Sequence, residues 1–278
     1  MTIFDARICA LGEGALWHPL RAQLFWFDIL GKRMLSTNAQ EWHFAEMVSA
    51  AGWVDHDTLL LASETALFTF NLITRARKTV ALLEADNPIT RSNDGRADPV
   101  GGFWIGTMGK AAEPGAGAIY RLYKGELRRL FADITIPNAI CFAPDGRTAY
   151  FTDTTTQIVN RVALDAMGWP SAAPEPFIDF RAEGLNPDGA VTDAAGNLWI
   201  ALWGAGRIAV YDNQGNPQST LELPAPHITC PAFAGSTLYA TSATQGMGPA
   251  ALKAHPDAGK TFAIPNAGTG RPEPQVIL

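Results

Sequence analysis

The chain has 278 residues, of which 47% are hydrophobic, and a formal net charge of −6. The acidic balance and the absence of a lysine or arginine run argue against nucleic acid or an anionic membrane as the partner. No apolar run approaches the roughly 20 residues that cross a bilayer, and Met1 to Arg7 lack a signal-peptide pattern. The sequence therefore predicts a cytoplasmic globular protein that binds a small molecule and has no obligate protein partner.

Six short apolar strands recur along the chain, each after a turn rich in Gly, Asp or Asn. Successive anchor residues of these strands lie 35, 44, 46, 49 and 40 residues apart: Phe25, Leu60, Trp104, Tyr150, Trp199 and Tyr239. A period in the forties built from such strands is typical of a β-propeller with one four-stranded sheet per repeat. We therefore expect an all-β, six-bladed propeller with four-stranded antiparallel blades, in which residues 1–278 form a single domain.

An alternation of strands and helices would instead require amphipathic helices between the strands. The nearest candidate, residues 161–185, is interrupted by Pro170, Pro174 and Pro176, and proline breaks a helix interior. The Pro- and Gly-rich tail, residues 265–278, leaves open whether it closes the last blade or lies loose.

Four short polar motifs precede the anchors, and we interpret them as turns. They are Gly12-Glu13-Gly14, Asn93-Asp94-Gly95, Pro137-Asn138-Ala139 and Pro187-Asp188-Gly189. Glu13 and Asn138 lie 12 residues before their anchors, and Asn93 and Asp188 lie 11 before theirs. Equivalent positions of successive blades converge on the axis of a propeller, so these side chains should meet at one mouth of the channel. The other two blades carry Ala50 or Ala51 and Cys230 near this offset, which predicts packing there.

Two carboxylates and two amides are hard oxygen ligands. They suit Ca²⁺, Mg²⁺ or Mn²⁺ and tolerate Zn²⁺. The lack of a His or Cys ligand leaves the identity of the cation open. Any one of these motifs taken alone is explained by turn formation, but their recurrence in register favours a site. Asp145-Gly146 and Gly196-Asn197 fall at hairpin positions and are predicted to serve only as turns.

The motifs also carry a family resemblance. The segments that carry it are Leu11-Gly12-Glu13-Gly14 before Trp17, Arg91-Ser92-Asn93-Asp94-Gly95 before Asp98-Pro99 and Gly106-Thr107-Met108, Pro137-Asn138, and Asn186-Pro187-Asp188-Gly189. Together they resemble the regucalcin (senescence marker protein)/gluconolactonase/luciferin-regenerating-enzyme-like family, from about Cys9 to about Phe262.

This resemblance implies a six-bladed propeller that holds one divalent cation through Glu13, Asn138 and Asp188. It also implies that Arg91 and Asn93 bind oxygen atoms of the substrate beside the cation. Some relatives carry acidic residues just after Gly-Thr-Met, where this chain has Gly109-Lys110-Ala111-Ala112-Glu113. The missing substrate contact could therefore come from Glu113 or be replaced by Lys110, which would favour an anionic substituent on the substrate.

The function that we predict is metal-dependent hydrolysis of a sugar-acid lactone (an aldonolactone) to the aldonate. The cation would polarise the lactone carbonyl, and Asp188 would take the proton of the attacking water. One alternative is a phosphotriesterase-like esterase, because a hard cation polarises P=O as well as C=O. Another is a non-catalytic propeller that binds calcium or a protein.

A few residues remain outside this interpretation. Trp203 is a candidate for the wall of the pocket, where an aromatic face would suit a sugar ring. His227 enters the sixth blade near the channel, and Asp153 with Thr154 to Thr156 are candidates for the pocket edge. The three cysteines, Cys9, Cys141 and Cys230, lack metal-binding spacing, so we expect them to be reduced and buried.

Overall fold

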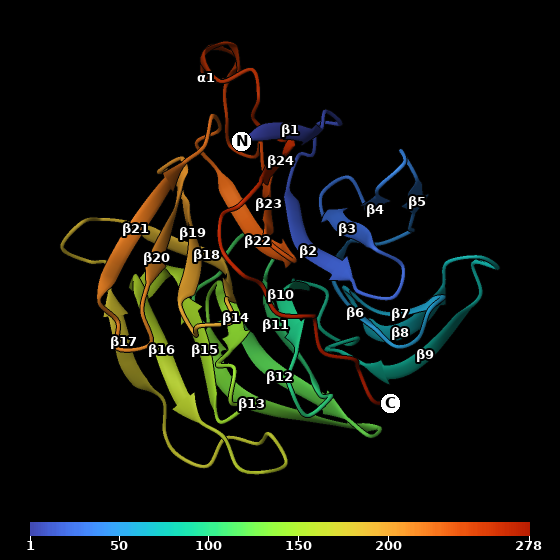
Figure 1. Ribbon diagram of the computed structural model, residues 1–278. Coiled ribbons are helices and arrows are strands. Elements are labelled where there is room, and N and C mark those ends of the chain that lie inside the picture. Colours follow the sequence, from blue (N-terminus) through green and yellow to red (C-terminus); the bar gives the residue numbers. More distant parts are fainter.

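The computed structural model describes all 278 residues as six four-stranded sheets arranged around a central axis (Figure 1). Every paired strand runs antiparallel to its neighbours, so the predicted all-β six-bladed propeller is confirmed. The innermost strands, β2, β6, β10, β14, β18 and β22, contact one another in chain order, and β22 returns to β2. The ring is therefore closed. None of the helices has the length and hydrophobicity that a membrane-spanning segment needs.

The first three blades each take four consecutive strands from the innermost to the outermost. Blade 1 contains β2 (Gly12–His18), β3 (Gln23–Asp28), β4 (Arg33–Ser36) and β5 (Glu41–His43). Blade 2 contains β6 (Val48–Trp53), β7 (Thr58–Ser63), β8 (Ala66–Asn71) and β9 (Arg77–Leu82). Blade 3 contains β10 (Thr90–Ala97), β11 (Phe103–Gly109), β12 (Gly117–Tyr123) and β13 (Glu126–Ile134).

Blades 4 and 5 repeat this order, and blade 6 is built from both ends of the chain. Blade 4 contains β14 (Pro137–Phe142), β15 (Thr148–Asp153), β16 (Ile158–Ala163) and β17 (Glu175–Asp179), with the 3₁₀ turn η1 (Thr154–Thr156) after β15. Blade 5 contains β18 (Asn186–Thr192), β19 (Leu198–Trp203), β20 (Arg207–Tyr211) and β21 (Pro217–Glu222). Blade 6 contains β22 (Ile228–Ala234), β23 (Thr237–Ser242), β24 (Thr261–Ile264) and β1 (Thr2–Asp5).

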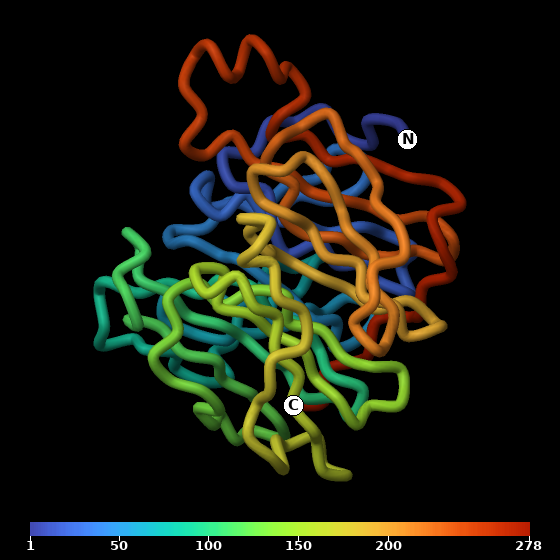
Figure 2. Tube along the Cα trace, turned by 90° about the vertical axis from the view of Figure 1, so that its left-hand side faces the viewer, coloured from blue at the N-terminus to red at the C-terminus, as the bar shows by residue number.

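The outermost strand of blade 6 is the N-terminal strand β1, which pairs with β24 through Thr2↔Ala263 and Ile3↔Phe262. Both ends of the chain thus contribute to one sheet, and the backbone hydrogen bonds of this sheet close the ring. The proline-containing segment 161–185 forms no helix, as expected. The short helix α1 (Pro249–Ala254) in the β23–β24 connection was not predicted, and Figure 2 shows this connection projecting from one end of the molecule.

All six anchor residues lie on the second strand of a blade, namely β3, β7, β11, β15, β19 and β23. These strands are sandwiched between neighbouring strands of their own blade and the adjacent blades, which explains their continuous apolar character. Phe25, Leu60 and Trp104 are completely buried, and burying such a side chain contributes about 1.5–3 kcal/mol to folding. The three cysteines are free and buried, as expected.

The interpretation of the four polar motifs as turns is wrong, because they lie inside the innermost strands. Their residues belong to β2, β10, β14 and β18. In each of these strands the pairing register shifts at the motif, as between Glu13 and Leu16 or between Asn138 and Cys141. Such β-bulges use the residues that turns also use, because the extra residue needs an unusual backbone conformation. Gly14 and Ala139, for example, have φ values of 58° and 54°.

The C-terminal tail, residues 265–278, runs across the face of the ring where the innermost strands end (Figure 1, red). Its backbone bonds to five other segments: Gly270 N donates to Gly235 O, Ala194 N to Thr269 O, Val276 N to Trp53 O, Ile277 N to Gly101 O and Lys124 N to Ile277 O. In addition, Arg271 donates to Phe142 O and Thr192 Oγ1. The tail therefore joins blades 2 to 6 at the end of the channel opposite the polar motifs.

A buried ion pair fixes the middle of this tail in the channel. Glu273 pairs with Nη1 of Arg96 on β10, and both residues are less than 10% exposed. Arg96 also donates to Pro231 O in blade 6. The pair thereby links the tail to two blades that face each other across the axis.

Replacing Glu273 by alanine should lower the free energy of unfolding by about 3–5 kcal/mol, because the charge of Arg96 would stay buried without its partner. The matched control is Glu126→Ala, which breaks the exposed pair of Glu126 with Arg128 and should cost less than about 1 kcal/mol. Denaturant unfolding of both variants measures this difference. Equal losses in the two variants would show that the tail is not anchored by this pair.

Candidate active site

A cavity of about 590 Å³ opens at the mouth of the channel where the innermost strands begin. Six of the predicted site residues line it: Glu13, Arg91, Asn93, Lys110, Asn138 and Asp188. They come from blades 1, 3, 4 and 5, so the convergence expected from the sequence is present. The Ala and Cys positions of blades 2 and 6, Ala50, Ala51 and Cys230, are buried without lining the cavity.

Two carboxylates from blades 1 and 5 face each other in this cavity. Glu13 on β2 and Asp188 on β18 are only 5% and 4% exposed. Burial, followed by the charge of Asp94, raises the pKa of Glu13 to about 8. Burial, followed by the charge of Glu13, raises the pKa of Asp188 well above its usual range. Two such groups cannot both be ionised at low cost unless a proton or a cation lies between them.

A third carboxylate lies next to this pair. Asp94 on β10 is buried, and its Oδ2 accepts a hydrogen bond of 2.8 Å from Ile140 N. Burial raises the pKa of Asp94 to about 6. Arg91 is the nearby cation, but burial lowers the pKa of its guanidinium group to about 10 despite the opposing charges of Glu13, Glu64 and Asp188. Negative groups therefore predominate at the base of the cavity.

A chain of hydrogen bonds orients the amides of the site. Arg91 Nη1 donates to Asn93 Oδ1 over 2.8 Å, and Asn93 Nδ2 donates to Asn138 Oδ1 over 3.0 Å. Asn138 Nδ2 then donates to Thr154 Oγ1, which donates to Pro187 O over 2.7 Å. Because each donor has an acceptor, the amide groups of Asn93 and Asn138 are held in a defined orientation. The network joins blades 3, 4 and 5 around the two carboxylates.

The two candidates after Gly-Thr-Met lie in different surroundings. Lys110 lines the rim of the cavity, where its Nζ forms an ion pair of 2.5 Å with Glu64 and donates to Pro88 O. Glu113 does not line the cavity. Its Oε2 accepts a hydrogen bond of 3.1 Å from Ala111 N within the same turn, so its carboxylate closes that turn.

Several other residues that line the cavity were predicted from the sequence only as candidates for the pocket wall or edge, or were not predicted. Met108, Thr154 and Trp203 each lie four residues after the anchor of their blade and all line the cavity. The recurrence that located the carboxylates would therefore have found these three as well. Gln245 and Gly246 also line the cavity, but they lie in the long β23–β24 connection, where the repeat gives no guide. Asp153 instead accepts hydrogen bonds from the backbone of Thr135 and Ile136.

The donor set of the cavity fits a hard divalent cation. No group of three or more His, Cys, Asp or Glu side chains is arranged as a metal site, so an amide oxygen has to complete the set. Asn138 Oδ1 accepts one hydrogen bond, and an amide oxygen retains a second lone pair. Glu13 Oε2 accepts only a long bond of 3.2 Å from Gly14 N. Glu13, Asp188 and Asn138 line the same cavity and are the residues that would offer oxygen ligands to such a cation.

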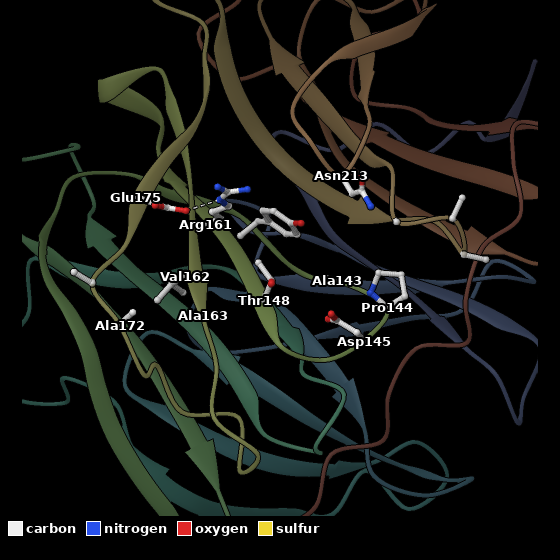
Figure 3. Close-up of a pocket in the computed structure, with 15 residues that line it drawn as sticks. Ala143, Pro144, Asp145, Thr148, Arg161, Val162, Ala163, Ala172, Glu175 and Asn213 are labelled. Atoms are coloured by element: carbon white, nitrogen blue, oxygen red, sulfur yellow. Dashed lines mark hydrogen bonds and ion pairs between the residues drawn. The ribbon is translucent and has the colours of Figure 1, made fainter.

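A second cavity, of about 630 Å³, lies between blades 4 and 5 near the hairpin at Asp145-Gly146 (Figure 3). Its polar side chains are mostly satisfied, since Arg161 and Glu175 form an ion pair of 2.7 Å and Asp145 accepts from Arg147 N. Gly146 and Gly196 occupy left-handed turns beside it, which agrees with the prediction of simple hairpins. No predicted site residue lies in this cavity.

Three comparisons place this geometry among known proteins. A model of the SMP-30/gluconolactonase/LRE-like region matches residues 11–244. A protein of Rhizobium meliloti that is named as a sugar lactone lactonase is 41% identical over 277 residues, covering 96% of this chain and 94% of the relative. The L-arabinolactonase of Azospirillum brasilense is 34% identical, covering 91% of this chain and 87% of the relative. The solved structure of a calcium-binding protein, regucalcin, from Agrobacterium tumefaciens is 40% identical with a TM-score of 0.97, covering 100% of this chain and 97% of its own.

The paired carboxylates predict how stability depends on pH and cations. Because the folded state raises the pKa of Glu13 from 4.5 to about 8, it binds the proton more tightly than the unfolded chain does. In the presence of chelator, the contribution of Glu13 to stability should therefore be fully present below about pH 4.5 and be lost as the pH rises through about 8. An added divalent cation should raise the Tm more at pH 8, by about 5 °C or more, than at pH 5.

The variant Glu13→Gln should lose the part of the pH dependence that Glu13 contributes, and with it most of the response to the cation. Glu113→Gln is the control, because Glu113 lies outside the cavity, and it should behave as the parent protein does. Thermal unfolding at the two pH values, with chelator and with Ca²⁺, measures both effects. A cation response that persists unchanged in Glu13→Gln would place the cation elsewhere.

Proposed function

Because the chain belongs to the SMP-30/gluconolactonase/LRE-like family, we propose that it is a lactonase that opens a sugar-acid lactone to the aldonate with the help of one divalent cation. The observation that carries this proposal is the pair of buried carboxylates, Glu13 and Asp188, beside the fixed amide of Asn138 in a single cavity. The sugar lactone class follows from the named activities of the lactonase relatives. Calcium is the first cation to test, because the regucalcin relative is a calcium-binding protein.

Glu13, Asn138 and Asp188 are the proposed ligands of the cation. When bound, the cation would supply Lewis acidity toward the carbonyl oxygen of the lactone. Asp188 is the proposed general base, since it is a buried carboxylate that lines the cavity together with the other two proposed ligands. Its Oδ atoms would take a proton from the water that attacks the carbonyl carbon.

The chemical balance of the reaction needs no other reactant. The water oxygen bonds to the carbonyl carbon, the bond from that carbon to the ring oxygen breaks, and the ring oxygen leaves as a hydroxyl group. The proton that Asp188 accepts is returned to that ring oxygen or to solvent. The products are an open-chain aldonic acid, which ionises, and the regenerated carboxylate.

Arg91 and Asn93 are the proposed substrate-binding groups. Both hydrogen bonds that Arg91 makes within the protein come from Nη1, which leaves Nη2 for oxygen atoms of the substrate. Asn93 has an additional positioning role, because its amide group contacts Arg91, Asn138 and Pro137 O. Lys110 already pairs with Glu64, so the proposal does not require an anionic substituent on the lactone.

Replacing Asp188 by asparagine keeps the shape of the side chain but removes the proton acceptor. We expect kcat to fall by about 10²- to 10⁴-fold on the best lactone substrate, with little change in Tm because the folded state loses a buried charge. The control is Asp145→Asn, since Asp145 lies in the cavity between blades 4 and 5, and its kcat should stay within about twofold of the parent value. A pH-indicator assay on a panel of aldonolactones measures the rates.

Retained turnover in Asp188→Asn would remove the assignment of this residue as the base. If the parent protein, folded and supplied with a cation, opens no lactone in the panel, the enzymatic proposal fails. A phosphotriester substrate in the same panel tests the esterase alternative, and calcium binding without any turnover would favour a non-catalytic calcium-binding propeller.

A further inference from the structure

Two aromatic side chains in the cavity take no part in the mechanism described above. Trp203 ends β19 in blade 5, and His227 immediately precedes β22 in blade 6. Their rings are stacked, with centroids 4.0 Å apart and planes inclined by only 8°. Both residues line the cavity that contains Glu13 and Asp188.

The backbone around this pair holds it in place. Trp203 and His227 form an isolated antiparallel β-bridge between blades 5 and 6. Two further bonds flank the bridge, from Gly206 N to Pro226 O and from Ala243 N to His227 O, at 2.9 and 3.0 Å. Trp203 also pairs with Asn186, two residues before Asp188. The stacked rings are thus fixed relative to the proposed base and do not sit on a free loop.

The pair lies on the side of the cavity opposite the cationic groups. In a closed ring of six blades, blade 6 faces blade 3. Blade 3 supplies Arg91, Asn93 and Lys110, whereas blades 5 and 6 supply Trp203 and His227. A ring-shaped ligand between these sides would meet hydrogen-bond donors along one edge and an aromatic surface on the other. Aromatic surfaces of this kind suit the C–H faces of sugars.

His227 also retains unused hydrogen-bonding capacity. Its Nδ1 is buried and has no hydrogen-bond partner in the protein. Burial lowers the pKa of His227, although the nearby backbone of Gln245 acts in the opposite direction, so the imidazole is neutral at pH 7. A neutral imidazole has one donor and one acceptor nitrogen, so a ligand hydroxyl that reached Nδ1 would supply the partner that this nitrogen lacks.

On the basis of the proposed function, we propose that Trp203 and His227 form the surface on which the ring of the sugar lactone rests, and that His227 recognises a hydroxyl group of that ring. The pair determines the affinity and selectivity for the sugar, whereas the two carboxylates of the cavity determine turnover. A pair that merely packed blades 5 and 6 together would affect stability without distinguishing one lactone from another.

Steady-state kinetics of Trp203→Leu and His227→Phe test this assignment. Trp203→Leu removes the aromatic surface, and we expect KM for an aldonolactone to rise about tenfold while kcat stays within about threefold. His227→Phe preserves an aromatic ring but lacks the nitrogens. Its KM should therefore rise for aldonolactones and stay unchanged for δ-valerolactone, which has no hydroxyl groups.

Trp203→Phe is the conservative variant: it keeps an aromatic ring and should therefore keep most of the affinity for the aldonolactone. It also provides a test of the ring if Trp203→Leu folds poorly. Unchanged KM values in Trp203→Leu and His227→Phe would overturn the proposal. So would an equal rise in KM for aldonolactones and δ-valerolactone in His227→Phe, since that result indicates packing alone.

Calorimetric titration with an aldonolactam, in which an N–H group replaces the ring oxygen, separates this inference from the proposed function. If the parent protein binds the lactam and Trp203→Leu binds it at least about tenfold more weakly, the surface is supported even where no lactone is hydrolysed. If the two proteins bind the lactam equally, the surface is rejected whether or not the parent is a lactonase. If the parent protein hydrolyses no lactone but binds the lactam more tightly than Trp203→Leu does, the result contradicts the proposed function and leaves the aromatic surface supported.

Discussion

Two carboxylates, Glu13 and Asp188, lie buried within reach of each other at one mouth of a closed ring, and the character of the site follows from this arrangement. Burial raises the pKa of both groups, together with the charge of Asp94 for Glu13 and the charge of Glu13 for Asp188. A site of this kind is tolerated only when a proton or a cation compensates it. The neighbouring amide of Asn138, held by Asn93 and Thr154, provides the neutral oxygen that a hard cation needs.

The scaffold explains how such an arrangement can persist. Each blade supplies one innermost strand, and in blades 1, 3, 4 and 5 a β-bulge near the start of that strand accompanies one or two side chains that line the channel mouth. The ring is closed by the pairing of β1 with β24 and, at the far end of the channel, by the tail and its buried pair of Glu273 with Arg96. The free-energy cost of the buried charges and bulged strands at one mouth is therefore offset by packing between the blades. The contacts of the tail with the blades at the other mouth offset it further.

Much of the fold could be predicted because the anchors of the second strands repeat at a nearly constant spacing, and their burial on all sides makes them conspicuously apolar. The residues of the site could be predicted because they recur at a fixed offset from those anchors. The same residue types serve turns and bulges, so the motifs were misread as turns. Contacts between distant segments carry no local signal, which explains why the path of the tail and the stacking of Trp203 on His227 required the structure.

The central claim is that Glu13, Asn138 and Asp188 together hold one cation at the mouth of the channel. Crystals of the protein grown with Mn²⁺ and measured for anomalous scattering test it most directly. We expect a single strong anomalous peak bounded by the two carboxylates and the amide oxygen of Asn138. A peak at another position, or none at this position in protein that is active with Mn²⁺, would contradict the account.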